Sequence, residues 1–549
     1  MHITRLRHTF FLSIIGLLAV GCGQTVKNAK SALKDSIKTQ SIKEWNKTIP
    51  GNFSTQTQTI FDSTAIDSFL KQYPEFNACA GEIHKFYNTR KFAYAWFDSK
   101  GLLEQAGNLA DRVLNLKNEG VNKDIPYKSR FDSLLNEANH QPSKHNIQLE
   151  LMLTAQYFTF AQIAWQGMDT SVSKSANWYL PRKKISYDLY LDSLLKKPFN
   201  KDGASQEPVY RQYELLRGFL SKYRALAEKE SWDKIVADKR SYKPGDSSAV
   251  ISAIKHRLHL LGDYSGNSFD GKYDTLTEKA VAQFQYRHGL PADGAIGSAT
   301  LAQLNVPLST RIRQIIVNME RSRWLPVSLN TNYIAINIPE FKLHVYHADS
   351  LLWSCNVVVG QSVHKTVVFY GELQYIVFSP YWNVPASIVR NEILPEMRRN
   401  PNYIARHRME ITGYTNGLPE VRQKPGPANS LGLVKFLFPN SYNIYLHDTP
   451  AKSLFNESSR AFSHGCIRVS EPARLAAFLL KNDPNWDAQK ISKAMNSGRE
   501  QYVTLKNKVP VFIAYFTAFI DRAGLMNFRN DVYDRDDRLA EMLIARQGK

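Results

Sequence analysis

The chain has 549 residues, enough for roughly three or four compact domains of about 100–200 residues each. Hydrophobic residues make up 43% and charged residues 22%, a composition that excludes a wholly disordered chain, a collagen-like fibre and a disulfide-stapled miniprotein. The 70 Lys and Arg residues outnumber the 50 Asp and Glu residues and leave a net charge of +20. Such a balance favours an anionic partner: nucleic acid, a membrane surface or an acidic polymer.

The N-terminus predicts export. Residues 1–22 start with a basic segment, continue with the apolar run Phe10–Val20, which is too short to span a bilayer, and end in Gly21-Cys22. Residues 18–22 resemble the lipobox of bacterial lipoproteins, in which the cysteine is lipidated and becomes the new N-terminus. We therefore expect a signal at 1–22, a lipid anchor at Cys22 and a place in the cell envelope or periplasm, with no nucleic-acid partner. The alternatives are a cleaved soluble signal and a retained membrane anchor.

The next 200 residues divide by composition. Residues 23–60 are polar and predict a flexible tether. Residues 61–240 carry apolar residues at three- and four-residue spacing, which predicts a helical scaffold domain of unknown role. Its strongest helical patterns cover residues 102–116, 147–166, 187–195 and 210–229.

Residues 241–307 predict a small helical domain. Apolar residues lie on one face of a helix at Ala249–Leu261, Thr277 is the expected cap of a second helix, and Ser298 opens a third. The pattern over residues 274–300 resembles the three-helix peptidoglycan-binding module. The alternative is a helical spacer that has lost binding.

Residues 308–549 predict a β-rich domain, because β-branched runs of period two follow one another without regular helices between them. A polar insertion at 387–430 interrupts the strands and predicts a lid over a site, with a helix at 387–400 and a Pro/Gly loop at 422–427. The expected strands are 333–338, 342–346, 355–359, 374–378, 443–446, 503–505 and 511–519.

One cysteine stands in a chemically suggestive place. Cys466 lies in a segment that also contains His464, and a predicted strand ends upstream at His447, with Tyr445 on the same face by alternation. A thiol needs a base to become a good nucleophile, and His447 is the expected general base. His464 competes for that role, because positions i and i+2 share a face in an extended loop. A zinc site built from His447, His464 and Cys466 is the third possibility.

The residue before the nucleophile is a glycine. Gly465 permits close backbone approach and an unusual φ, so that N–H groups around Gly465 and Cys466 can hold an oxyanion. If Cys22 carries lipid, three cysteines remain, and at least one thiol in an exported protein is then free. Cys355 is expected to be a buried, inert thiol.

These residues carry a family resemblance. His447 and Ser463 bracket residues 448–462, which fits the pattern of a His, 14–17 residues and Ser/Thr-His-Gly-Cys found in bacterial L,D-transpeptidases (YkuD-like). Residues 422–436 and 445–450 continue the likeness, and residues from about 330 to 540 resemble the catalytic domain. With the scaffold and the peptidoglycan-binding module, the chain resembles the large multi-domain members.

The resemblance implies a mechanism and partners. Cys466 would form a thioester with the third residue of a peptidoglycan stem tetrapeptide and release D-Ala, and an amine of an acceptor stem would resolve it as a 3→3 cross-link. Water as the acceptor would make the enzyme an L,D-carboxypeptidase, and a wall-binding protein without activity is the non-enzyme alternative. No cofactor or metal is implied. The residues expected at the site are the catalytic Cys466, His447, His464 and Gly465 and the substrate-binding Tyr445, Arg468, Ser463 and Trp382.

Overall fold

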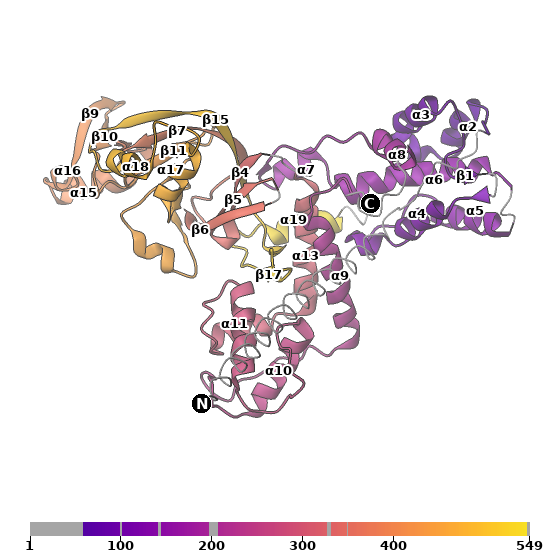
Figure 1. The fold of residues 1–549 in the computed structure, drawn as a ribbon, viewed down its shortest axis with the longest axis horizontal. Coiled ribbons are helices and arrows are strands. Elements are labelled where there is room, and N and C mark those ends of the chain that lie inside the picture. Colours follow the sequence, from indigo (N-terminus) through magenta and orange to yellow (C-terminus); the bar gives the residue numbers. More distant parts are fainter. Residues whose placement is uncertain are drawn as a thin grey trace, which may run out of the picture. The chain divides into compact units, whose positions relative to one another are not determined.

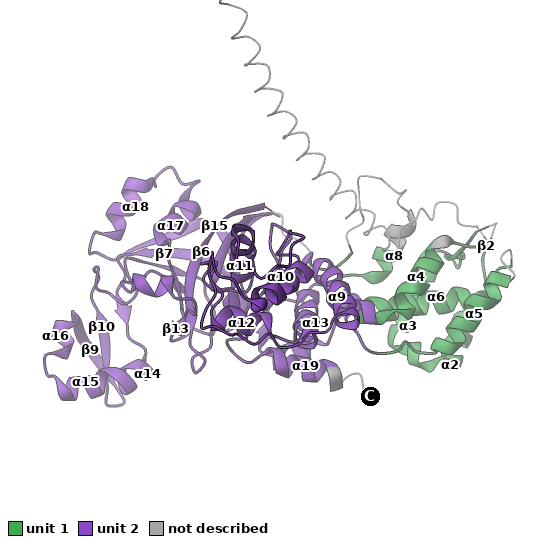
Figure 2. Cartoon of the chain, turned by 90° about the horizontal axis from the view of Figure 1, so that it is seen from below, with its two compact units in different colours: residues 1–116, 123–163, 185–208 green, residues 117–122, 164–184, 209–549 purple. Residues whose placement is uncertain are grey.

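The computed structural model describes residues 59–98, 101–140, 144–196, 207–326, 331–348 and 350–545. The predicted signal with Cys22, and the tether up to residue 58, lie outside these residues. The chain forms two compact units, one of residues 1–116, 123–163 and 185–208 and the other of residues 117–122, 164–184 and 209–549 (Figure 2). In the described ranges, no helix is both long enough and apolar enough to cross a membrane.

The first unit is helical and is drawn in indigo and purple in Figure 1, which confirms the helical N-terminal region that the apolar spacing predicted. Its central helix α6 (Ile147–Phe160) is buried along almost its whole length, and the Asn146 side chain caps it by accepting from the N–H of Gln148 and Leu149. The other elements are α2 (Thr64–Gln72), η2 (Pro74–Cys79), α3 (Ala80–Thr89), β1 (Phe97–Asp98), β2 (Gly101–Leu102), α4 (Glu104–Leu114), α5 (Lys128–His140) and α8 (Tyr187–Lys196).

The second unit begins with segments that pack on helix α13 (Leu308–Arg323). Glu320 of this helix is buried and accepts from the backbone N–H of Met168 at 2.6 Å and from the Trp324 indole at 2.9 Å. Strand β3 (Trp178–Tyr179) pairs with the main sheet. These bonds explain why residues 164–184 belong to this unit. Between and beside them lie the π-helical turn η4 (Ala161–Gln166), α7 (Thr170–Ser175), η3 (Leu116–Glu119) and α9 (Gln212–Lys229).

The predicted three-helix module is present, as α10 (Ala249–Leu261), α11 (Thr275–Arg287) and α12 (Ser298–Leu304). Gly262 ends α10 in the left-handed conformation, with φ of 90°. The predicted cap of the second helix was wrong. Asp274, not Thr277, caps α11, because its carboxylate accepts from the Thr277 N–H at 2.7 Å and from the Thr277 hydroxyl at 2.8 Å.

The β-rich region is a ten-stranded sheet that closes on itself, because β11 pairs with both β12 and β7. The order is β11-β12-β14-β6-β5-β4-β15-β7-β3, and β13 adds to β6. The strands are β4 (Asn332–Asn337), β5 (Lys342–His347), β6 (Ser350–Gly360), β7 (Val368–Phe378), β11 (Val434–Leu437), β12 (Leu446–His447), β13 (Ala461–Ser463), β14 (Ile467–Val469) and β15 (Gln501–Ala514).

The sheet encloses the main hydrophobic core of this unit, and helices α17 (Pro472–Leu480) and α18 (Ala488–Met495) cover it with Leu475, Ile491 and neighbouring apolar residues. Each fully buried Val, Leu or Ile side chain contributes about 1.5–3 kcal/mol, so this core dominates the stability of the region. The remaining elements are η5 (Ile338–Glu340), η7 (Lys452–Asn456), the hairpin β16 (Ala518–Ile520) and β17 (Met526–Phe528), and α19 (Asp536–Ala545).

Three predicted strands differ from the observed ones. The strand expected at 443–446 begins only at Leu446, because Asn443 has a φ of 55° and turns the backbone out of the extended region. The strand expected at 503–505 and the first part of the one expected at 511–519 are joined in β15, which changes register between Thr504 and Val509 and ends at Ala514, and residues 518 and 519 belong to β16. The β-rich architecture itself is confirmed.

The insertion folds as a small body of its own. It combines helices with a three-stranded sheet in the order β8-β10-β9, around a cluster that includes Val389, Ile393 and Val421. The expected loop at 422–427 was wrong at its start, since β10 runs to Gln423, and the expected helix contains a π-helical turn. The elements are β8 (Trp382–Asn383), α14 (Ala386–Ile388), η6 (Val389–Ile393), α15 (Leu394–Arg399), α16 (Tyr403–Arg406), β9 (Met409–Thr415) and β10 (Leu418–Gln423).

Candidate active site

Three adjacent strands divide their side chains between the core and one outer face. In register across β11, β12 and β14, Phe436 pairs with Leu446 and Leu446 with Ile467, and all three are fully buried in the core. Residues opposite one another in neighbouring strands share a face, and successive residues alternate. The next register row, made of Lys435, His447 and Arg468, therefore lies on the face away from the core.

Cys466 extends this face by one position. It precedes β14 by one residue, and the Ile467 N–H donates to the Tyr445 carbonyl, so Cys466 lies opposite Tyr445 and two residues before Arg468. The Cys466 thiol donates to the Asn443 carbonyl oxygen at 3.5 Å. The Tyr445 ring lies 5.7 Å from the His447 ring, centre to centre. Thiol, imidazole, phenol and guanidinium thus meet on one surface of the sheet.

The electrostatics of this surface favour neutral groups at rest. Burial raises the pKa of the Cys466 thiol, and hydrogen bonds from Tyr445 and the charge of Arg468 only partly oppose that rise. Burial, and then the Arg468 charge, lower the pKa of His447 to about 3, against weaker opposing bonds to the carbonyls of Asp448 and Leu431. The resting pair is a neutral thiol beside a neutral imidazole.

The hydrogen bond of His447 fixes its tautomer. Nδ1 lies 2.5 Å from the carbonyl oxygen of Asp448, and a carbonyl can only accept, so Nδ1 carries the hydrogen. Nε2 is then the basic nitrogen. The Asp448 carboxylate in turn accepts from the Leu433 N–H at 2.9 Å and pairs with Lys452, which holds the end of β12 in place.

The loop before the nucleophile is tied down on both sides. Gly465 has a φ of 113°, and its N–H donates to the Ser463 hydroxyl at 3.2 Å, while that hydroxyl donates to the Cys466 carbonyl at 2.5 Å. The buried Thr366 hydroxyl donates to the Gly465 carbonyl at 2.8 Å and accepts from the Gly360 N–H at 2.9 Å. Ser463 is thus a support of the loop backbone in this structure.

His464 pairs with the insertion. The left-handed φ of Gly465 breaks the alternation that an extended loop would have, and the His464 Nε2 lies 2.9 Å from the Glu392 carboxylate of the insertion. Its ring also lies 5.1 Å from the ring of His364. The geometry favours His447 over His464 as the base. Among the described residues, no three His, Cys, Asp or Glu side chains gather as a metal-ion site, so the zinc alternative lacks its ligands.

Two of the expected substrate-binding residues have distinct surroundings. Trp382 is half-buried and packs against the hydrophobic cluster of the insertion. Arg468 is half-buried, and within the described part of the chain its Nε atom is buried without a hydrogen-bond partner. A buried guanidinium nitrogen without a partner is costly, and an anionic ligand would satisfy it.

The other two thiols in the described part of the chain are unsuited to catalysis. Cys79, Cys355 and Cys466 are all free. Cys79 and Cys355 are buried, and burial raises their pKa values to about 12 and about 11. This matches the expectation that Cys355 is an inert core thiol.

Sequence reasoning missed several residues that hold the site. Thr366 and Gly360 support the loop, and the Tyr533 hydroxyl donates to the Gly360 carbonyl at 2.6 Å. Lys435 is the neighbour of His447 in register, and burial lowers its pKa; its ammonium donates to the Tyr381 carbonyl at 3.3 Å. These residues are far from Cys466 in the chain, and no local pattern marked them.

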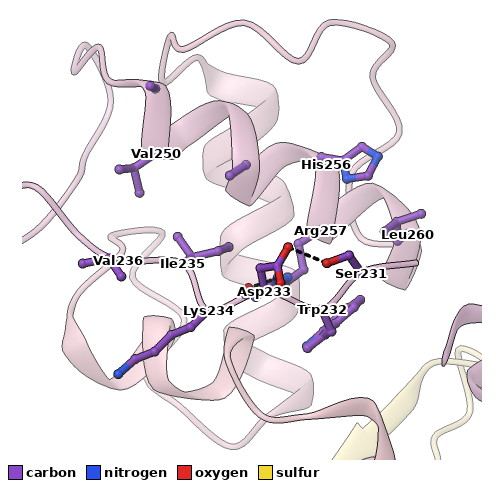
Figure 3. A pocket seen from close by; sticks show the side chains of 12 residues that line it. Ser231, Trp232, Asp233, Lys234, Ile235, Val236, Val250, His256, Arg257 and Leu260 are labelled. Carbon is purple, nitrogen blue, oxygen red and sulfur yellow. Dashed lines mark hydrogen bonds between the residues drawn. The ribbon is translucent and has the colours of Figure 1, made fainter. Parts of the chain in front are cut away.

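A separate hollow of 460 Å³ lies beside the three-helix module (Figure 3). Residues 231–236 and helix α10 line it, and the Arg257 guanidinium lies 4.4 Å from the centre of the Trp232 ring. Arg257 is largely satisfied by backbone carbonyls, including that of Leu304 at 3.2 Å. None of the residues predicted for the catalytic site lines this hollow.

Three family models match the chain. The L,D-transpeptidase catalytic domain (YkuD) matches residues 331–491, the scaffold domain matches residues 81–220, and the "Putative peptidoglycan binding domain" matches residues 247–304. A curated relative, the "Putative L,D-transpeptidase" of Haemophilus influenzae, is 34% identical over 247 residues, which are 42% of this chain and 50% of the relative. The chain thus spans about half the length of this relative.

Solved structures of L,D-transpeptidases from Xylanimonas cellulosilytica and Stackebrandtia nassauensis are 16% and 15% identical to this chain. Each covers 51% of it, with 100% and 97% of its own length matched, and the TM-scores are 0.18 and 0.22.

The sheet, the outer face with its thiol and imidazole, and the family match together define an L,D-transpeptidase catalytic domain at residues 331–491. Ahead of this domain, residues 81–220 match the scaffold domain and residues 247–304 match the peptidoglycan-binding domain.

Proposed function

We propose that this chain is a cysteine-dependent acyltransferase that forms 3→3 cross-links between peptidoglycan stem peptides in cell wall biogenesis. The observation that carries the proposal is the meeting of Cys466, His447, Tyr445 and Arg468 on one face of two neighbouring strands. Only a thiol acyl-transfer reaction needs this combination, since a wall-binding protein has no use for a base of fixed tautomer beside a thiol.

Acylation starts from the neutral pair. As the Cys466 sulfur forms a bond with the carbonyl carbon of the third stem residue, its proton moves to Nε2 of His447. The Nδ1 hydrogen bond to Asp448 holds the imidazole while it becomes positively charged. The tetrahedral oxygen carries the negative charge, and in this proposal the Cys466 N–H stabilises it, because the Gly465 N–H already donates to Ser463.

The intermediate then collapses to a thioester. The bond between the carbonyl carbon and the D-Ala nitrogen breaks, and His447 returns its proton to that amine, which leaves as D-Ala. An amine of the acceptor stem next attacks the thioester and gives its proton to His447, and the carbon–sulfur bond breaks. The proton passes from His447 back to sulfur, so that the resting thiol is restored and one amide bond has replaced another.

Arg468 supplies the binding element of the proposal. The stem peptide carries carboxylates, and the Nε atom of Arg468 is buried without a partner beside the nucleophile. A carboxylate bound there would also offset the charge that lowers the pKa of His447, and so would make the imidazole a better base once substrate is present. Substrate binding and base strength would thereby be coupled.

The cellular setting remains part of the proposal. A lipid anchor at Cys22 and a tether over residues 23–60 would hold the enzyme at a membrane of the envelope, in reach of the wall. The peptidoglycan-binding domain would add a second attachment to the same polymer, which raises the local concentration of stems. The net charge of +20 suits a polymer rich in carboxylates.

The decisive experiment is incubation of the protein with purified disaccharide-tetrapeptide, followed by separation and mass analysis of the products. Dimers that lack one D-Ala indicate transfer, tripeptides indicate an L,D-carboxypeptidase, and unchanged tetrapeptide indicates a protein without either activity.

Two variants test the assigned roles in the same assay. Cys466→Ala should abolish both D-Ala release and the covalent adduct, because no other accessible thiol lies on this face. His447→Ala should lower acylation by about two to four orders of magnitude, the usual contribution of a general base. Dimers made by the Cys466→Ala protein, or undiminished acylation by the His447→Ala protein, would contradict these roles.

A further inference from the structure

The insertion touches the catalytic loop through one ion pair. Glu392 lies in the π-helical turn η6, and its carboxylate is 2.9 Å from Nε2 of His464. The two side chains are about half exposed, and they come from segments more than seventy residues apart in the chain, as the residue numbers show. π-Helical turns are rare and are frequently found at functional sites.

The ion pair fixes the tautomer and the orientation of the His464 ring. An ionised carboxylate only accepts hydrogen bonds, so Nε2 of His464 must carry the hydrogen that Glu392 accepts. The ring of His364 lies 5.1 Å from the His464 ring, centre to centre, and is tilted by 35° relative to it. Glu392 is therefore the group that sets both the tautomer and the direction of the His464 side chain.

The nucleophile lies close enough in the chain for the orientation of His464 to affect its position. His464 is separated from Cys466 only by Gly465, whose φ of 113° gives the loop a conformation that most residues avoid. Thr366 holds the Gly465 carbonyl from the sheet side, and Glu392 holds the His464 side chain from the insertion side. The loop that presents the thiol is thus fixed from two directions.

We infer that Glu392 is a positioning residue for the transfer reaction: it fixes the His464 imidazole and, through the His464-Gly465-Cys466 backbone, the position of the thiol. The inference rests on the proposed function. It assigns to the insertion a direct part in the geometry of the nucleophile, beyond covering the site.

The insertion contains a matched control. Glu396 lies one helical turn further on, in α15, and pairs with Arg399 of the same helix at 2.9 Å. It is about as exposed as Glu392, and its ion pair stays within the insertion. Loss of Glu396 removes a similar charge from the same body without releasing the catalytic loop.

The experiment compares Glu392→Ala, Glu392→Gln and Glu396→Ala in the full chain, with D-Ala release from disaccharide-tetrapeptide as the activity. We expect Glu392→Ala to lower kcat about tenfold with KM changed less than twofold, which corresponds to one hydrogen bond lost from the reacting geometry. Glu392→Gln should stay near the original kcat, because its amide oxygen still accepts from Nε2. Glu396→Ala should be unchanged.

A second readout does not depend on activity. In protein labelled with 15N-histidine, the His464 signals, assigned by their loss in His464→Gln, should show hydrogen on Nε2 in the original chain and in Glu392→Gln, and a mixture of tautomers in Glu392→Ala. If the original chain releases no D-Ala, the proposed function fails while this readout still tests the positioning. Unchanged His464 signals in Glu392→Ala, a change in KM alone, or a Glu392→Gln protein as impaired as Glu392→Ala would each overturn the inference.

Discussion

Because the Cys466 thiol is neutral at rest, the rate at which it is alkylated should depend on pH. Burial raises the pKa of Cys466 above the ordinary thiol value of about 8.5, so below that pH the thiolate fraction rises about tenfold for each pH unit. Iodoacetamide reacts with the thiolate, so the alkylation rate is proportional to the thiolate fraction. The rate at Cys466 should therefore rise about 100-fold between pH 6.5 and 8.5, without a plateau.

The assay is peptide mass spectrometry after timed alkylation, which scores each cysteine separately. Cys79 and Cys355 are internal controls, since they are buried and have pKa values of about 12 and about 11, and they should stay unmodified in the folded protein. Arg468→Met removes a charge that lowers the thiol pKa, so alkylation of Cys466 should be slower at every pH. His447→Ala should keep the pH slope, because the imidazole is uncharged in this range.

A different result would refute the electrostatic reasoning. A rate that changes less than about twofold over these two pH units would mean that a thiolate–imidazolium pair already exists at rest. The same conclusion would follow if His447→Ala abolished alkylation at neutral pH. In either case burial would not dominate the pKa of the site as inferred here.

Three further variants test the scaffold of the site and of the module. Asp263→Ala leaves the buried guanidinium of Arg287 without the carboxylate that binds its Nε at 2.7 Å, and should lower the free energy of unfolding by about 3–5 kcal/mol, seen as a lower unfolding temperature in calorimetry. Gly360→Ala should lose the fold of the nucleophile loop, since its Cβ would stand 2.0 Å from the His364 carbonyl; normal D-Ala release and an unchanged unfolding temperature would contradict this. Thr366→Val removes both hydrogen bonds of that hydroxyl, and should lower kcat for D-Ala release by about tenfold or more with the unfolding temperature less affected than in Gly360→Ala; wild-type kinetics would show that the loop holds its position without it.

Local patterns were sufficient for the strand that carries the base. Period-two alternation predicted that Tyr445 and His447 face the same way, and the structure has both on the outer face. For His464 the sequence left the outcome open, because alternation would place it beside Cys466 only in an extended loop, and Gly465 instead adopts a positive φ that the surrounding fold selects. A glycine permits such a conformation, but its presence in the sequence does not predict it.

The insertion shows a signal that was present and overlooked. Strands β9 and β10 are joined by Asn416-Gly417, with φ values of 51° and 77°, the turn residues that favour a two-residue hairpin. By contrast, nothing near Thr366 or Tyr533 in the sequence indicates their contacts with the nucleophile loop. Those contacts arise where β6, the segment that follows it and the C-terminal region meet, and such long-range meetings leave no local periodicity.

The pairing of β11 with β7 has a consequence for how this enzyme can diversify. Val434 lies opposite Phe378, so the whole segment of residues 379–433 leaves and re-enters the sheet at neighbouring positions. Because the two ends are already held together, the outer part of this segment can change in length at little entropic cost, as long as a carboxylate remains at the position of Glu392 to pair with His464. Under the proposed function, selectivity for different wall peptides can therefore change with this segment, while Cys466 and His447 stay on the same face of the sheet.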